Sequence, residues 1–278
     1  MVDSPPVIEM TKEEIGALHR EANRLDRLLT VSSRFDLTQP PLADSPMDRA
    51  TKADLREAYD MAYGLIYAAE DHLTTILLIL KVGPVPGFSL YTLLRPAIEA
   101  EVRCRHLLDP NIDERLRLSR GLTERLQNLE EQHKADQGNG AVAEDFFKER
   151  VAHLEERAKA NGITVIRTRK PPHAVRAFEE ERTPLYDMFV THFPGGGGGT
   201  VFRFLSGFIH IKPWVWITRD RAQPSSEPGM ALVRTDLNVT LFAGVLKTTL
   251  DLHDENIKNF LNLSGFTPDI WALAKQRP

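Results

Sequence analysis

The sequence predicts an all-α protein, built as an antiparallel helical bundle with additional helices. Apolar residues recur at steps of three and four in several long segments, which is the spacing of one helix face. Clusters of Pro, Gly and Asn separate these segments, and alternating runs typical of strands are few and short. The chain has 278 residues, 42% of them hydrophobic, so it is long enough to bury the core that such a bundle needs.

The N-terminal part, residues 1–46, is predicted to hold one helix and a connector. Thr11 suits an N-cap, and Glu13 and Glu14 suit the first turn of a helix over residues 11–30. Its apolar stripe consists of Ile15, Leu18, Ala22, Leu25 and Leu29. Residues 33–45 contain two adjacent prolines and read as the connector.

The remaining residues, 47–278, are predicted to form a helical bundle domain. The expected helices are 47–81, 89–109, 112–134, 142–158, 171–181, 185–193, 200–210, 235–263 and 268–274. The helices at 112–134 and 142–158 are expected to pair in antiparallel fashion. Residues 163–166 suit a short extended piece, and the glycine run 195–199 suits a flexible joint within the domain.

The charge balance and the cysteine content exclude several classes of protein. Lys and Arg number 35 and Asp and Glu number 39, so the net charge is −4 and no global positive field attracts nucleic acid. Contact with nucleic acid is therefore confined to a local region. The single cysteine, Cys104, can form neither an internal disulfide nor a cysteine-based zinc site.

Nothing in the sequence predicts contact with a membrane. The first residues lack the basic and apolar regions of a secretory signal. The most apolar run, residues 73–80, is much shorter than the roughly 20 residues that a spanning helix needs. We therefore expect a buried helix at this run and a cytoplasmic location.

The segment 203–210 carries the sharpest candidates for chemistry. Seven helical residues make two turns, so Arg203 and His210 are predicted to share one helix face, with Ser206 between them. A guanidinium can hold a phosphate with two hydrogen bonds, and an imidazole can transfer protons near neutral pH. The pattern suits metal-independent cleavage of a phosphodiester, with Arg203 and His210 as catalytic residues and Ser206 positioning the substrate. The alternative is structural: Arg203 reaches solvent along an apolar surface and His210 caps a turn.

A second polar stripe lies on the predicted helix 89–109. Its members are Arg95, Glu99, Arg103 and His106, spaced so that they line one face of an otherwise apolar helix. Charged residues on a buried helix need partners. One interpretation is an internal ladder of ion pairs, and the other is a substrate-binding pocket, formed by Arg95 and Glu99, beside the helix that carries His210.

The stretch 212–221 interleaves basic and aromatic residues, among them Trp214 and Trp216. Aromatic stacking combined with phosphate contacts is how proteins bind single-stranded nucleic acid. The two tryptophans are therefore candidates for substrate binding. The alternative is that they anchor a loop onto the core.

Neither a metal nor a cofactor is predicted. The glycine run 195–199 lacks the Gly-Lys-Ser/Thr ending of a phosphate-binding loop. A di-iron bundle needs two Glu-x-x-His motifs, and the sequence has one, at Glu130 and His133. Cys104 lies in an apolar segment and is interpreted as a core residue.

Three short motifs resemble a group of uncharacterised bacterial helical proteins of the actinobacterial type, which are related to the HEPN-like superfamily. They are Leu-Leu-Arg-Pro-Ala-Ile-Glu-Ala at 93–100, Leu-Leu-Asp-Pro at 107–110 and Phe-Leu-Ser-Gly-Phe-Ile-His at 204–210. The resemblance spans residues 50–262. It implies an all-α bundle that often forms a homodimer.

The same resemblance implies a function. Many HEPN-like proteins are metal-independent RNA endonucleases in toxin–antitoxin and phage-defence systems, which suggests RNA and a partner protein such as an antitoxin as binding partners. Their Arg and His meet across the dimer, and this motif maps onto Arg203 and His210. The residue after the Arg is commonly polar in active members, whereas here it is Phe204. The alternative function is therefore a non-catalytic interaction protein that binds a protein partner or a small ligand.

Overall fold

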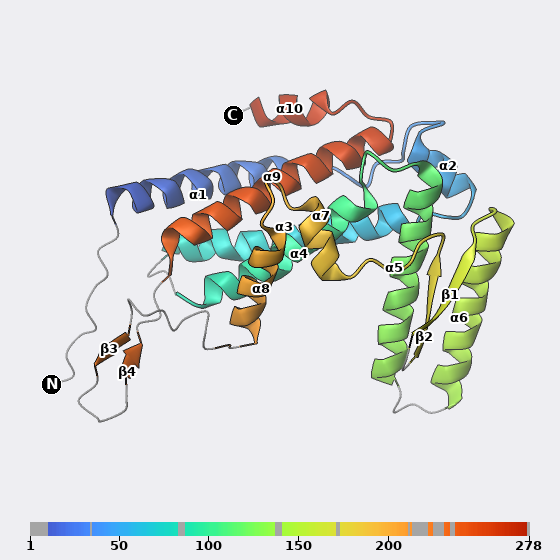
Figure 1. Ribbon diagram of the computed structural model, residues 1–278. Helices are drawn as coiled ribbons and strands as arrows, with labels where there is room; N and C mark the ends of the chain where they lie inside the picture. Colours follow the sequence, from blue (N-terminus) through green and yellow to red (C-terminus); the bar gives the residue numbers. More distant parts are fainter. Residues whose placement is uncertain are drawn as a thin grey trace. The chain divides into compact units, whose positions relative to one another are not determined.

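The computed structural model describes residues 11–33, 35–82, 87–136, 141–170, 173–210, 212, 222–224, 231–233 and 237–276. Within these residues the protein is mostly helical, as the sequence predicts, with two short two-stranded sheets (Figure 1). The elements, in chain order, are α1 (Lys12–Ser32), α2 (Pro46–Lys52), α3 (Glu57–Val82), α4 (Ser89–Leu107), α5 (Glu114–Ala135), α6 (Ala141–Ala160), β1 (Val165–Lys170), β2 (His173–Phe178), α7 (Leu185–His192), α8 (Gly198–Ile209), β3 (Ala222–Pro224), β4 (Ala231–Val233), α9 (Val239–Leu263) and α10 (Asp269–Gln276).

The chain divides into two compact units. Unit 1 consists of Met1–Phe35, Tyr67–Val102 and Phe189–Asp254, and unit 2 consists of Asp36–Ile66, Arg103–Met188 and Glu255–Pro278. Helices α3, α4, α7 and α9 therefore contribute residues to both units.

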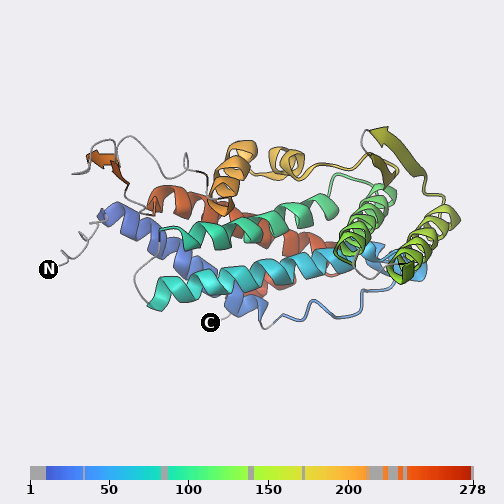
Figure 2. The ribbon, with the colours of Figure 1, turned by 90° about the horizontal axis from the view of Figure 1, so that it is seen from below.

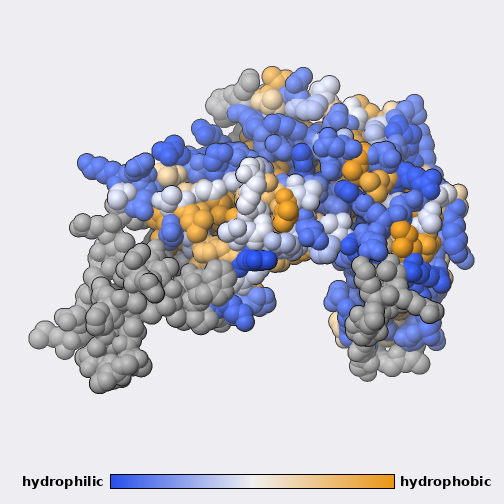
Figure 3. Space-filling model, in the orientation of Figure 1, coloured by the Kyte–Doolittle hydropathy of each residue, from blue (hydrophilic) through white to orange (hydrophobic). Residues whose placement is uncertain are grey.

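Unit 1 is a group of long helices. Figures 1 and 2 both show α1 beside the parts of α3 and α9 that belong to this unit. Ion pairs join α1 to two of them, with Arg24 at 2.7 Å from Asp251 and Lys81 at 2.9 Å from Asp26. The outward face of α1 carries mainly hydrophilic residues (Figure 3). This is the amphipathic pattern of a helix that covers one side of a core.

The N-terminus of α1 confirms the predicted cap. The Thr11 side chain accepts a hydrogen bond from the Glu14 amide at 3.2 Å, and the Glu14 carboxylate accepts one from the Thr11 amide at 2.9 Å. This reciprocal pair is a capping box, which satisfies two backbone donors that the first turn leaves without partners.

Unit 2 is centred on the antiparallel pair α5 and α6, which Figure 1 shows side by side, with the β1–β2 hairpin against them. Its core consists of buried apolar residues from α5, α6, β2, the loop before β1 and the chain before α3: Leu55, Leu122, Leu126, Leu129, Val151, Leu154, Ala158, Ile163 and Phe178. The pairing predicted for 112–134 and 142–158 is thus confirmed.

The prediction of one continuous helix over 47–81 is wrong. Helix α2 ends at Lys52 and α3 begins at Glu57. Between them Asp54 adopts the left-handed conformation, with φ of 55°, and the next residue, Leu55, is buried in the core of unit 2. Asp tolerates this conformation better than most residues. No Gly or Pro marks the break, so the periodic pattern alone did not reveal it.

The prediction of a helix over 171–181 is also wrong. Residues His173–Phe178 form β2, which pairs antiparallel with β1, so that Val165 lies opposite Phe178. The Phe178 amide donates a hydrogen bond to the Thr123 hydroxyl at 3.1 Å, which attaches the strand to α5. The hairpin exists because its apolar residues cover the core of the α5–α6 pair, a gain that a local reading of this stretch misses.

The apolar run 73–80 lies inside α3, with Leu73, Ile76 and Leu77 buried. Among the residues that the structure describes, no helix has the length and apolar character needed to cross a bilayer.

Candidate functional site

The predicted catalytic segment lies on α8, and the glycine run before it has a structural role. Gly197 is the N-cap of α8 and has φ of 76°, a conformation that favours glycine. Gly198 begins the helix so close to α7 that an added Cβ would lie 2.0 Å from the Phe189 carbonyl oxygen. Two glycines of the run are therefore required for α8 to start and pack where it does.

His210 follows the end of α8 instead of lying inside the helix as predicted. It is the C-cap, and its amide donates a hydrogen bond to the Ser206 carbonyl at 3.0 Å. The Lys212 amide donates to the Gly207 carbonyl at 2.8 Å, which is the six-residue bond of a Schellman ending. This ending stops the helix and leaves His210 at its tip.

Arg203 and His210 are both exposed, and Ser206 between them is half-buried. Seven residues of helix correspond to a rise of about 10 Å, so the two groups are spread along the helix face. A guanidinium and an imidazole at this separation suit successive groups of an extended polyanion better than one small ion.

Phe204, the residue after Arg203, is half-buried and packs against other aromatic rings of unit 1. Its ring meets the Tyr91 ring edge-on at 5.4 Å, and Tyr91 in turn stacks on Phe208 at 4.3 Å. Phe242 of α9 joins the same cluster at 5.8 Å from Tyr91. The aromatic side chain at 204 thus holds α8 against α4.

Arg95 is 4% exposed, and its guanidinium lies over two aromatic rings, 4.4 Å from Phe202 of α8 and 5.0 Å from Phe189 of α7. Glu99 is its ion-pair partner at 3.4 Å. Burial lowers the pKa of Arg95 and the Glu99 carboxylate opposes this shift. The polar stripe is predicted to lie beside the helix that precedes His210. Its contact with that helix, α8, is made by Arg95 on the Phe202 ring. Arg95 fastens α4 to α8 by a cation–π contact.

The other members of that stripe enter different contacts, in unit 2. Arg103 forms an ion pair with Glu124 of α5 at 2.5 Å. His106 is buried, and its carbonyl accepts a hydrogen bond from Arg120 at 2.9 Å. Of the predicted ladder of ion pairs within this helix, the structure shows the Arg95–Glu99 pair. Arg103 pairs with a residue of α5 instead.

Sequence reasoning missed a buried charged cluster in unit 1. Glu101 of α4 and His253 of α9 are each fully buried, and the Glu101 carboxylate lies 2.8 Å from Nδ1 of His253. The Glu70 carboxylate of α3 lies 3.4 Å from the other ring nitrogen, Nε2. Ser32 of α1 donates a hydrogen bond to Glu70, so four helices meet at this cluster.

The cluster holds His253 as a cation. Burial by itself lowers the pKa of His253, but the two carboxylates outweigh it and raise the pKa to about 10. A charged imidazolium between two carboxylates satisfies the demand that buried charges be paired. Because the carboxylates face opposite ring nitrogens, they do not converge on one point as metal ligands would. Within the described residues no group of three or more His, Cys, Asp or Glu side chains can hold a metal ion.

The positions of Glu101 and His253 in the sequence could have revealed this cluster, because each continues the apolar stripe of its helix. In α4 one stripe of fully buried positions recurs at steps of four and three, and Glu101 occupies one of them: Leu90, Leu94, Ala97, Glu101 and Cys104. His253 occupies the matching pattern in α9: Phe242, Leu246, Thr249, His253 and Asn256. A charged residue in step with an apolar stripe indicates a buried partner.

Trp214 and Trp216 lie outside the described residues, so the predicted aromatic contact has no structural counterpart here. The chain matches no protein-family model, no curated protein and no solved structure. What this protein does must therefore be argued from its own residues, above all from the exposed Arg203 and His210 of α8.

Proposed function

We propose that the protein is a cytoplasmic, HEPN-like RNA-binding protein that cleaves RNA without a metal ion and works as a homodimer. The observation that carries the proposal is the exposure of Arg203 in the middle of α8 and of His210 at its C-terminal cap. The resemblance at 204–210 supports the same assignment. Stress or phage defence, with an antitoxin as partner, is the setting that this resemblance suggests.

In the proposed reaction Arg203 holds a phosphate of the RNA, and Ser206 helps to position it. His210 removes the proton of the ribose 2′-hydroxyl, whose oxygen then attacks the adjacent phosphorus. The bond between phosphorus and the 5′-oxygen breaks, and that oxygen takes up a proton. A well-placed acid–base group accounts for about 10²- to 10⁴-fold in rate.

A dimer would supply the second set of groups. One helix face carries its two groups about 10 Å apart along the axis, so a matching face from a second copy would bring an Arg and a His to the same phosphate. Ile209, next to His210, is 45% exposed, and this apolar side chain supports the proposal that a second copy covers it. Sedimentation velocity, with wild type and Ile209→Ser, tests the dimer.

The catalytic proposal is tested by incubating RNA with the purified protein in EDTA. His210→Ala is expected to slow cleavage at least 100-fold, and Arg203→Ala to weaken RNA binding as well. The matched controls are His19→Ala and Arg20→Ala, which alter the same residue types on the exposed face of α1. Equal cleavage by wild type and His210→Ala would refute this role for His210.

The second candidate is a non-catalytic protein that binds a protein partner or a small ligand. It is favoured by Phe204, because the polar side chain of active family members is replaced here by one that packs on Tyr91. A stable complex recovered with a defined partner, together with RNA that stays intact at all protein concentrations, would favour this candidate.

A further inference from the structure

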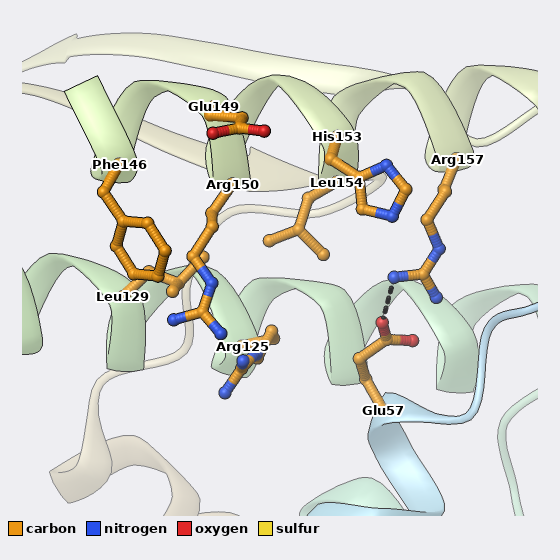
Figure 4. A pocket seen from close by; sticks show the side chains of 9 residues that line it. All are labelled: Glu57, Arg125, Leu129, Phe146, Glu149, Arg150, His153, Leu154 and Arg157. Atoms are coloured by element: carbon orange, nitrogen blue, oxygen red, sulfur yellow. Dashed lines mark ion pairs between the residues drawn. The ribbon is translucent and has the colours of Figure 1, made fainter.

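Unit 2 contains a cavity of about 360 Å³ between α5, α6 and the first turn of α3 (Figure 4). This volume lies within the range of small-molecule binding sites, about 300 to 1,000 Å³. The buried side chains of Leu129 and Leu154 contribute apolar lining. The cavity is thus part of the antiparallel pair itself, and its lining residues come from outside α8.

One end of the cavity is held by an ion-pair network. Arg157 lies 2.7 Å from Glu57 and 2.8 Å from Asp54, so two carboxylates face one guanidinium. Figure 4 shows Arg157 reaching from α6 toward Glu57 at this end. This network fixes the wall without contributing free positive charge.

The middle of the cavity holds two further guanidinium groups. Figure 4 shows Arg150 extending from α6 toward α5, where Arg125 lies. Arg150 has a weak hydrogen bond to Gln132 at 3.4 Å, and within the described part of the chain no carboxylate or other partner contacts Arg125. Glu149 also lines the cavity, but its carboxylate lies alongside α6, away from these two groups (Figure 4). Two cations that face one cavity without carboxylate partners favour the binding of an anion.

The cavity also offers a flat apolar surface. Phe146 of α6 is 51% exposed, which is unusual for so large an apolar side chain, and the guanidinium of Arg150 lies 4.7 Å from its ring centre. A planar group that enters the cavity can stack on this aromatic ring, on the guanidinium plane, or on both.

We propose that this cavity is a binding site for a small organic anion that combines a phosphate or carboxylate group with a flat ring. Arg125 and Arg150 hold the anionic group, and Phe146 with Leu129 and Leu154 holds the ring. A nucleoside monophosphate has this chemistry, and so does an aromatic carboxylate. The inference goes beyond the proposed RNA cleavage and does not depend on it, because no residue of the α8 face takes part.

Isothermal titration of the full-length protein with adenosine 5′-monophosphate, adenosine, inorganic phosphate and benzoate tests the site. Adenosine monophosphate is expected to bind at least tenfold more tightly than adenosine or phosphate alone, because each lacks one half of the recognised chemistry. Tight binding of benzoate in place of adenosine monophosphate would support the site and identify the carboxylate source.

The variants Arg125→Gln and Arg150→Gln are each expected to weaken binding of the recognised anion at least tenfold, as expected for the loss of one charge-assisted contact. Phe146→Leu is expected to weaken ring-containing ligands while leaving phosphate binding unchanged. Lys159→Gln is the matched control, since it removes one positive charge from an exposed position of α6 outside the cavity. Circular dichroism confirms that each variant is folded. Failure of both adenosine monophosphate and benzoate to bind the intact protein, or equal binding by the folded arginine variants, would overturn the proposal. Measurable binding of adenosine and its monophosphate with equal affinity would also overturn it, because the anionic group would then contribute nothing.

Discussion

The most informative single residue outside the proposed sites is His253, which is fully buried and carries a charge. Its Nδ1 contacts Glu101 at 2.8 Å, across 152 positions of sequence, and its Nε2 faces Glu70. Removing one partner from such a cluster leaves the other charges buried and unpaired. The resulting loss of folding stability is much larger than the net contribution of the intact cluster to that stability. His253 is therefore expected to act through stability, in contrast to the exposed His210.

The first prediction concerns His253 and pH. The pKa of His253 is raised to about 10 in the folded protein. The stability that its charged form gives to the folded state is therefore complete below pH 6.5, its ordinary pKa, and is lost as the pH rises through about 10. The free energy of unfolding should then fall by about 1.4 kcal/mol per pH unit across this window. Urea unfolding between pH 7 and 9 measures this slope below the titration of Tyr59, whose pKa burial raises to about 12.

His253→Gln should flatten that slope and lower the stability at pH 7 by about 3–5 kcal/mol, since it leaves Glu101 buried without its cation. His19→Gln, on the exposed face of α1, should change neither quantity. An unchanged slope in His253→Gln would contradict the assignment of His253 as the titrating group.

The second prediction concerns the packing role of Arg95. Its guanidinium covers the rings of Phe189 and Phe202, and its partner Glu99 is 31% exposed and can be hydrated without it. Arg95→Met keeps the bulk without a buried charge and should stay within about 1 kcal/mol of wild type. Arg95→Lys should cost about 1–3 kcal/mol, because a compact, strongly hydrated ammonium cannot cover two rings. Equal stability losses in urea unfolding of the two variants would contradict this account.

At the scale of elements, close approach of helices decides where small residues are required. Gly121 of α5 meets the backbone of α3 so closely that an added Cβ would lie 2.3 Å from the Ala58 amide nitrogen. Gly64, in the middle of α3, has open space around the same position. The two residues look alike in the sequence, since each interrupts a helical pattern, but they differ in what surrounds them.

The third prediction uses this contrast. Gly121→Ala should destabilise the protein by about 1–3 kcal/mol, because α5 must move away from α3 to admit the methyl group. Gly64→Ala should stabilise it by about 0.5–1 kcal/mol, because Ala restricts the unfolded chain and favours the helix. Thermal unfolding of both variants measures the difference, and a loss of stability in Gly64→Ala would show that its surroundings are not open.

At the scale of the whole molecule, the net charge of −4 limits how the protein can hold a polyanion. Protein–RNA affinity falls with salt in proportion to the number of phosphates that cationic groups neutralise. Among the residues that the structure describes, the α8 face offers Arg203 and, beyond the helix end, the exposed Lys212. RNA binding should therefore be confined to this face, and the affinity should depend only weakly on salt concentration.

The fourth prediction follows from that count. The slope of log K against log salt for single-stranded RNA should lie near −1 to −2, about 0.7 for each neutralised phosphate. Fluorescence anisotropy with a labelled oligonucleotide measures it between 50 and 200 mM salt. Arg203→Ala should make the slope shallower by about 0.7, whereas Arg20→Ala on α1 should leave it unchanged. A slope much steeper than −2 would point to a larger basic surface than the α8 face.

The sequence by itself determined the all-α class, most helix positions and the N-cap at Thr11. These features depend on residues within one or two turns of each other, and their spacing is visible in the sequence. Tertiary structure alone decided the break at Asp54, the β1–β2 hairpin, the burial of Glu101 with His253, and the cavity between α5 and α6. Each of these depends on a partner far away in the chain, whose burial and charge outweigh local propensity. The same reason explains why Arg95 and Arg203, both predicted as site residues, differ so much in exposure: the guanidinium of Arg95 is buried over two phenylalanine rings, whereas Arg203 is exposed on α8.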